Sequence, residues 1–196
     1  MLKIATLGAV AALGMSGAAL AADGVSHSFL EAGYGYGELA GGLVDGDGFK
    51  VAGSLELPSN FVVGAGYRQF KYTDVGSEKF KELSAGVSYK WTLGSSFDVL
   101  AGPSFERLEI GSNGESGFGL NVGTRGRLTD KLELSANLQY VDIKTIPSTF
   151  LVTVGLRHYF TPAFAAGVDV RKSEMLVMAG ETSFIATLRY DFGKLF

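Results

Sequence analysis

The chain has 196 residues, no cysteine and a formal net charge of −3 at pH 7. This length fits a single domain, the absence of cysteine excludes disulfides and thiolate metal sites, and the slightly acidic balance offers no basic surface to nucleic acid. We therefore expect one domain that binds no nucleic acid and needs no cofactor.

Residues 1–21 have the pattern of a signal peptide. A basic residue precedes the apolar stretch 4–20, and Ala19 and Ala21 place small side chains where a signal peptidase cuts. The mature chain is then 22–196. After the apolar stretch, no uninterrupted apolar run approaches the roughly 18 residues that a membrane-spanning helix needs. If the mature chain enters a membrane, it does so with strands.

The rest of the chain shows about ten segments in which apolar and polar residues alternate. The last is the clearest, because alternate residues from Phe184 to Phe192 are aromatic or apolar while Arg189 and Asp191 lie on the other face. Segments of about ten residues with a period of two, separated by turn residues, are typical of outer-membrane barrels. We expect strands at 27–37, 48–57, 61–72, 80–91, 97–108, 117–128, 131–142, 149–160, 163–172 and 182–192. The sequence thus predicts an all-β fold, a transmembrane antiparallel up-and-down β-barrel of ten strands, with eight strands as the alternative if two weaker segments are loops.

The connections between these segments alternate in length. The short ones lie at 58–60, 92–96, 129–130 and 161–162, and the mostly longer ones at 38–47, 73–79, 109–116, 143–148 and 173–181. In bacterial barrels the short turns face the periplasm. An even number of strands therefore leaves both termini in the periplasm and places the longer loops outside the cell.

Aromatic residues gather near both ends of the predicted strands. Those toward the longer loops are Tyr34, Tyr36, Phe49, Tyr67, Phe105, Phe118, Tyr140, Phe150 and Phe184. Those toward the short turns are Phe61, Tyr89, Trp91, Phe97, Phe160, Phe164, Tyr190 and Phe192. Amphipathic rings at both headgroup levels fix the depth of a barrel in the bilayer, so we expect two aromatic girdles.

The polar face of the predicted strands is balanced in charge. Its acids are Glu31, Glu56, Glu82, Asp98, Glu106, Glu133, Asp169 and Asp191, and its bases are Lys50, Arg68, Lys90, Arg125, Arg127, Arg157, Arg171 and Arg189. Charges moved from water into a narrow lumen need partners. We therefore expect a lumen network of ion pairs, either structural or lining a pore. All of these residues except Glu56, Lys90, Asp98 and Asp191 form the candidate site.

The same face carries many glycines, among them Gly33, Gly64, Gly123 and Gly155. Solvent-facing strands would prefer Thr, Lys or Glu at such positions, whereas glycine suits a crowded and curved interior. This favours a membrane barrel over a soluble β-sandwich or a lipocalin-like cup.

Three patterns could carry chemistry, and each has a simpler explanation. Residues 33–37 (Gly-Tyr-Gly-Tyr-Gly) lack the strand–turn–helix context of a dinucleotide site. Residues 45–48 (Asp-Gly-Asp-Gly), in the first long loop, lack the other ligands of a calcium loop. Catalysis would depend on His27, at the periplasmic end, or His158, on the outward face beside two aromatic residues. We therefore expect no catalytic, metal or cofactor site.

Five stretches of the mature chain carry a family resemblance: 29–34 (Phe-Leu-Glu-Ala-Gly-Tyr), 47–49 (Asp-Gly-Phe), 63–67 (Val-Gly-Ala-Gly-Tyr), 86–89 (Gly-Val-Ser-Tyr) and the closing 188–192 (Leu-Arg-Tyr-Asp-Phe). Together they resemble the small outer-membrane β-barrel proteins of proteobacteria that are often labelled porin-family, including the quorum-associated set of xanthomonads. The resemblance implies the outer membrane of a Gram-negative bacterium, contact with its lipids and lipopolysaccharide, and folding by the barrel assembly machinery.

The C-terminus departs from that family. Such barrels commonly end on the aromatic residue of the last strand, whereas four residues follow Phe192 here. The assembly signal is therefore either Phe192 or the terminal Phe196, which keeps the outward parity.

Taken together, these features predict a non-enzymatic integral barrel with a structural or surface role through its extracellular loops. The alternative is a narrow porin-like channel for small solutes or ions, which predicts a conductance that changes when Arg125 or Arg157 is neutralised.

Overall fold

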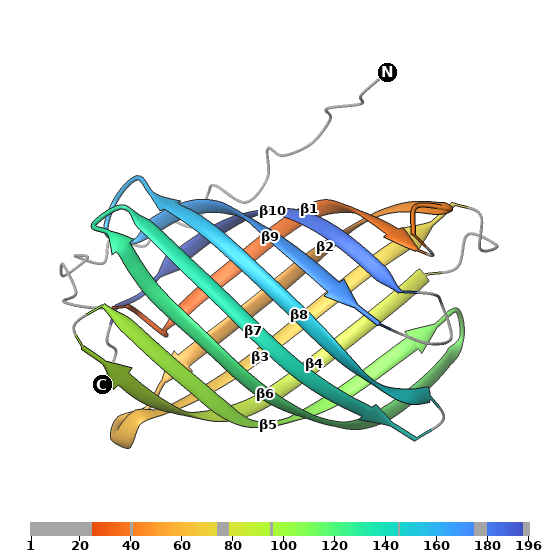
Figure 1. Ribbon diagram of the computed structural model, residues 1–196, viewed down its shortest axis with the longest axis horizontal. Coiled ribbons are helices and arrows are strands. Elements are labelled where there is room, and N and C mark those ends of the chain that lie inside the picture. The colour runs from red at the N-terminus through yellow and green to blue at the C-terminus, as the bar shows by residue number, and fades with distance from the viewer. Residues whose placement is uncertain are drawn as a thin grey trace.

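The protein forms one closed antiparallel barrel of ten strands (Figure 1). The computed structural model describes residues 25–39, 41–73, 79–94, 96–144, 146–174 and 180–193. The strands are β1 Phe29–Leu39, β2 Val44–Glu56, β3 Phe61–Tyr72, β4 Lys79–Leu93, β5 Phe97–Ile110, β6 Asn113–Thr129, β7 Leu132–Ile143, β8 Ile146–Tyr159, β9 Phe164–Ser173 and β10 Glu181–Asp191. Each strand pairs with its neighbours in the chain, and β1 pairs with β10 to close the barrel. The prediction of ten strands is confirmed, and the eight-strand alternative is wrong.

No helix in the described residues is both long and apolar enough to cross a membrane.

Several strands begin before the residue that the sequence predicted. β2, β6 and β8 start at Val44, Asn113 and Ile146, three to four residues early. The hairpins β1–β2 and β5–β6 keep their ladders up to these polar and glycine-rich ends, because main-chain hydrogen bonds between paired strands do not require apolar side chains. The predicted long loops are therefore shorter. Residues 45–47 lie in β2, so their assignment to a loop was wrong.

The outer face of the barrel is apolar. Every strand carries at least one large apolar side chain that is well exposed, for example Leu30, Val51, Phe61, Leu83, Phe105, Leu120, Leu138, Val152, Val168 and Leu188. A continuous exposed band of this kind is unfavourable in water and suits lipid. The lipocalin-like alternative, in which the apolar face would be the core of a soluble barrel, is excluded.

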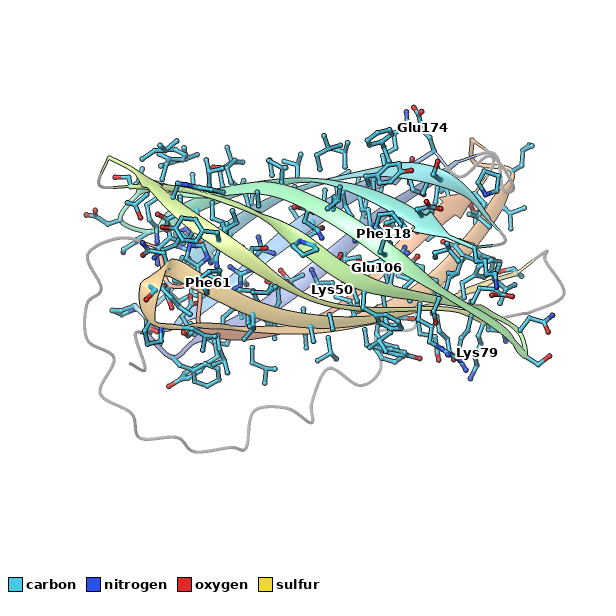
Figure 2. The ribbon with its side chains drawn as sticks, turned by 90° about the horizontal axis from the view of Figure 1, so that it is seen from below. Lys50, Phe61, Lys79, Glu106, Phe118 and Glu174 are labelled. Carbon is cyan, nitrogen blue, oxygen red and sulfur yellow. The ribbon has the colours of Figure 1, made fainter. Side chains whose placement is uncertain are left out.

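Aromatic side chains mark both ends of this outer face. Phe118 and Phe150 at one end are 51% and 57% exposed, and Phe61 and Phe160 at the other end are 44% and 62% exposed. In Figure 2, Phe61 and Lys79 lie toward opposite ends of the barrel. The two predicted girdles are therefore present, with neighbouring rings in contact, such as Phe160 and Phe164 at 6.2 Å between centroids.

The two ends of the barrel are named below by the expected direction of the short turns. The periplasmic end carries the 3-10 turn Pro58–Asn60 and the described termini. The extracellular end carries the connections that follow β1, β3, β5, β7 and β9.

Candidate functional site: the barrel lumen

The periplasmic half of the lumen contains a buried network of ion pairs, and Glu31 of β1 is one of its centres. This carboxylate is 2% exposed and lies 2.8 Å from Lys50 Nζ, 2.8 Å from Arg157 Nε and 2.7 Å from Arg189 Nη2. Lys50 and Arg157 also contact the Asp169 carboxylate, at 2.5 and 2.8 Å. Three bases are thus held between two acids, across five strands.

Glu133 of β7 is the second centre and is fully buried. Its carboxylate lies 3.0 Å from Arg125 Nη2 and 2.9 Å from Arg189 Nη1. The Tyr159 hydroxyl lies 3.0 Å from the same carboxylate and 2.6 Å from that of Asp191. Arg189 thus contacts both Glu31 and Glu133 and links the two centres.

The segment that precedes β1 enters this network from the periplasmic end. His27 is 1% exposed, and its Nε2 lies 2.8 Å from Asp98 Oδ2. Arg125 Nη1 donates to the Ser26 carbonyl at 2.8 Å, and Ser54 Oγ donates to the His27 carbonyl at 2.5 Å. Burial lowers the pKa of His27 below its ordinary value, although the hydrogen bond with Asp98 opposes the shift. His27 is therefore predominantly neutral at pH 7.

These contacts extend across the barrel. With the Lys90–Glu56 pair at 2.5 Å, residues of the periplasmic network come from every strand except β3 in the described part of the chain. Removing one partner from such a pair leaves an uncompensated buried charge, at a cost of about 3–5 kcal/mol. The network therefore holds opposite walls of the barrel together.

A smaller ionic layer lies closer to the extracellular end. Arg68 Nη1 lies 2.9 Å from Glu82, whose other oxygen lies 2.7 Å from Arg171. The Arg68 guanidinium also contacts Glu181 of β10 and lies 4.0 Å from the centre of the Phe70 ring. Here too, the charges on opposite walls are paired.

The extracellular end of the lumen is filled by apolar side chains. One cluster contains Leu39, Phe70, Tyr72, Phe80 and Ile185, and a second contains Leu108, Val141, Ile143 and Leu151. All of them are at most 8% exposed, and Ile110 packs against both clusters. Together they form an apolar layer contributed by seven strands, and Val44 of β2 packs at its edge.

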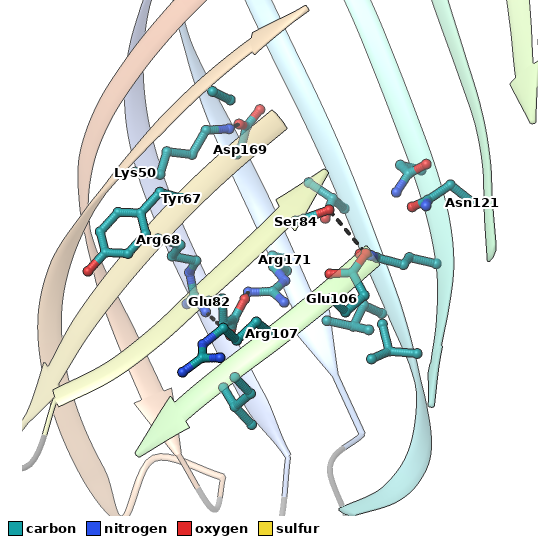
Figure 3. Close-up of a pocket in the computed structure, with 18 of the residues that line it drawn as sticks. Lys50, Tyr67, Arg68, Glu82, Ser84, Glu106, Arg107, Asn121, Asp169 and Arg171 are labelled. Carbon is teal, nitrogen blue, oxygen red and sulfur yellow. Dashed lines mark hydrogen bonds and ion pairs between the residues drawn. The ribbon is translucent and has the colours of Figure 1, made fainter. Parts of the chain in front are cut away.

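A cavity of about 350 Å³ lies between these layers (Figure 3). Glu106 of β5 is on its wall and is 8% exposed. Its Oε1 accepts hydrogen bonds from Ser84 Oγ at 3.0 Å, Ser104 Oγ at 2.5 Å and Gln139 Nε2 at 2.7 Å. In contrast to the other acids of the candidate site, Glu106 contacts neutral donors and no base within ion-pair distance among the described residues.

The structure brings nearly all of the candidate site residues into contact with an opposite charge. Ten of them form ion pairs: Glu31, Lys50, Arg68, Glu82, Arg125, Glu133, Arg157, Asp169, Arg171 and Arg189. Besides Glu106, the exception is Arg127, which lies 3.6 Å from the centre of the Tyr159 ring and donates to the Asp130 carbonyl at 3.1 Å. Arg127 is at the rim, where it stacks instead of pairing.

Sequence reasoning missed three residues that take part in the polar contacts of the lumen. Glu181 was assigned to a loop because the alternation weakens there, Tyr159 was noted only as a neighbour of the outward His158, and His27 was placed in the first strand. It also missed the apolar layer. Strand parity could have found that layer, because Phe70 and Phe80 share the inward register with Arg68 and Glu82.

The structure describes one of the two candidate assembly residues, Phe192. Phe192 directly follows β10, its backbone N–H donates to the Ser28 carbonyl at 2.8 Å, and its ring lies 5.3 Å from that of Tyr190. Phe196 lies outside the described residues, as do residues 1–24 with the predicted signal peptide. The described residues also contain no group of three or more His, Cys, Asp or Glu side chains arranged to hold a metal ion.

Neither a protein-family model nor a curated protein matches the sequence. Solved structures do match. The β domain of the Bordetella autotransporter Brka superposes with a TM-score of 0.52 at 7% identity, over 83% of this chain and 98% of that chain. The fold is that of a bacterial outer-membrane β-barrel. The KdgM porin (TM-score 0.45, 11% identity, 83% and 98% of the two chains) and Neisserial surface protein A (0.42, 15%, 85% and 97%) are further matches to this barrel.

At these identities the matches concern the fold alone. The narrower resemblance to xanthomonad quorum-associated barrels gains no support from them and stays a prediction.

Proposed function

We propose that this protein is a closed, non-enzymatic barrel that serves the envelope as a structural and surface component instead of an open pore. The observation that carries the proposal is the double filling of the lumen, by buried ion pairs toward the periplasm and by apolar side chains toward the outside. Each layer alone obstructs the path of a hydrated solute.

The two layers oppose passage for different physical reasons. Separating the Glu31 and Glu133 pairs would leave buried charges without partners. Crossing the apolar layer would require an ion to lose hydration where no side chain replaces it. A conducting state would therefore need both layers to rearrange.

The surface role is limited by the short extracellular connections. Residues 111–112 and 144–145 are all that joins β5 to β6 and β7 to β8. Binding functions of barrels usually lie in loops. At these two connections the protein offers hairpin ends outside the cell, not long recognition loops.

The lumen histidine is poorly placed for catalysis. The His27 ring contacts Asp98 and lies 3.5 Å from Arg125 Nη1, and it is 1% exposed. A general base must reach both a nucleophile and a substrate. Its contacts with two charged side chains support a structural role.

A narrow channel for small solutes or ions is the second candidate, and the central cavity favours it. A space of about 350 Å³ lined by both signs of charge could form one section of a transport path. For this candidate, the two filled layers would have to open as gates.

Planar-bilayer recording tests the proposal. Purified protein that shifts in gel mobility on boiling, and is therefore folded, is expected to give silent bilayers. Discrete conductance that changes in Arg157→Gln would overturn the closed barrel and support the channel. The control is a barrel of known conductance reconstituted in the same lipids, which shows that insertion has occurred.

A further inference from the structure

The charged side chains of the lumen do not balance once Glu181 is included. Between the apolar layer and the periplasmic turns, the described strands place eight bases and nine acids on the inward face. The bases are those that the sequence predicted, and the acids are the predicted eight together with Glu181. The lumen therefore carries one excess negative charge.

Three of these acids have no charged base within ion-pair distance among the described residues: Asp98 contacts the neutral His27, Asp191 contacts the Tyr159 hydroxyl, and Glu106 contacts neutral donors. Of the three, only Glu106 lines the cavity. Glu31, Glu82, Glu133 and Asp169 each contact at least one base. Glu106 is more than nine-tenths buried, and its Oε1 accepts hydrogen bonds from neutral donors only. A buried carboxylate without a counter-charge is costly unless something compensates it.

The hydrogen bonds around Glu106 determine which atoms are left facing the cavity. An ionised carboxylate only accepts, so the Gln139 amide must direct its Nε2 toward Glu106 and leave its own oxygen free. Ser104 donates its one hydrogen to Glu106, so its oxygen accepts from Asn121 Nδ2 at 2.7 Å, which leaves the Asn121 oxygen free as well. The Ser104 hydroxyl and the Gln139 amide therefore both donate to Glu106 Oε1, and the amide oxygens of Asn121 and Gln139 remain as acceptors.

Two further features shape the same wall. Asn137 also lines the cavity, and its amide has no hydrogen-bond partner within the described part of the chain. Gly119 lies beside Glu106, where a Cβ atom would come within 3.0 Å of Glu106 Oε1 and 2.6 Å of Ser104 Oγ. The glycine therefore leaves the space that the buried carboxylate occupies.

The opposite wall cannot supply the missing positive charge. Lys50 is held by Glu31 and Asp169, and Arg68 and Arg171 are both held by Glu82 (Figure 3). Moving any of these bases toward Glu106 would break an existing buried pair.

We propose that the cavity beside Glu106 is a binding site for a small, singly charged cation, held by the Glu106 carboxylate and the amide oxygens of Asn121, Asn137 and Gln139. Carboxylate and amide oxygens are the ligands that hard cations prefer, and the same acceptors suit an ammonium ion. A single positive charge neutralises the lumen. The site is independent of whether the barrel conducts.

The test compares stability in different cations at constant ionic strength. The protein is folded and then melted in lipid micelles with chloride salts of Na⁺, K⁺ or ammonium, each set against the bulky N-methylglucamine cation. A ligand that binds only the folded state raises the melting temperature with its concentration. For wild type we expect a rise of about 2–4 °C at saturating cation, and the cation that gives the largest rise identifies the metal ion or ammonium as occupant.

The variant Glu106→Gln keeps the size of the side chain and removes its charge. Its melting temperature is expected to be the same in all salts. Asn137→Ala retains the carboxylate and should show a reduced response, so it keeps the test decisive if Glu106→Gln folds poorly. Glu174→Gln, at an exposed position on the outer face, is the matched control and should respond like wild type.

Two results would overturn the proposal. Equal rises in wild type and Glu106→Gln would show a general salt effect. No rise in wild type with any of the three cations would mean that Glu106 is compensated in another way, such as by a proton.

Discussion

At the scale of single residues, the most constrained groups of this protein are acids that each hold several bases. Glu133 is fully buried and is contacted by Arg125, Arg189 and the Tyr159 hydroxyl. Because Glu133, Arg125 and Arg189 are buried, these contacts replace the hydration of the carboxylate and of two guanidinium groups. Losing the carboxylate therefore exposes more than one unpaired group.

Glu133→Gln tests this arrangement. The variant keeps the shape of the side chain but leaves two buried arginines without one of their acids, so the free energy of unfolding should fall by about 3–5 kcal/mol. Urea unfolding in lipid vesicles measures the change. Glu174→Gln, at an exposed position, should change it by less than about 0.5 kcal/mol. Equal losses in the two variants would show that the network contributes no more than a surface charge.

At the scale of elements, residues 25–28 form no strand and lie buried at the periplasmic end of the lumen. Groups that face His27 are Asp98, which hydrogen-bonds to it, and the Arg125 and Lys90 cations, which disfavour its protonation. The docked state therefore binds a proton less readily than the released segment. As pH falls below about 6.5, the ordinary pKa of histidine, the released state gains the proton first and docking weakens.

This predicts a pH-dependent release of the segment, with an equilibrium that changes by at most about tenfold per pH unit because one proton is involved. Hydrogen exchange at residues 25–28, compared at pH 7.5 and 5.5, measures it. His27→Gln cannot titrate and should lose the pH dependence in this segment. Protection that is unchanged between the two pH values in wild type would contradict the prediction.

The strands and their register were predictable from the sequence because each β-strand has a fixed period of two, and one face must suit lipid. That rule placed Arg157 and Arg189 in the lumen and Phe118 and Phe150 on the outer face. It failed where the two faces no longer differ in polarity. The starts of β2 and β6 are rich in glycine and polar residues and lack apolar side chains on the outward face, so the alternation gave no signal and main-chain pairing decided their length.

The candidate site was predictable as a set of residues but not as a set of pairs. Parity places Glu31 and Arg189 on one face, but it does not say which base on an opposite wall each acid meets. Those contacts join strands that are distant in the chain, such as β1 with β8. For the same reason, parity could not predict that Glu106 faces a cavity without a base beside it. That outcome depends on which bases already pair with other acids.

At the scale of the whole molecule, the lumen is a series of layers along one axis. From the periplasmic side these are the ion-pair network, the cavity with its flanking Arg68 layer, and the apolar layer. Barriers in series block a path as long as one of them remains. Opening a single layer should therefore leave the barrel closed, whichever layer it is.

Phe70→Ala with Leu108→Ala opens the apolar layer, and Arg157→Gln weakens the ionic one. We expect silent bilayers from each of these variants and discrete conductance from the triple variant, recorded under the same conditions as for wild type. Because large-to-small substitutions each cost about 2–5 kcal/mol, every variant must first show the gel shift of a folded barrel. Conductance from Phe70→Ala with Leu108→Ala alone would mean that the ion pairs do not block the lumen, and that the apolar layer is the single gate.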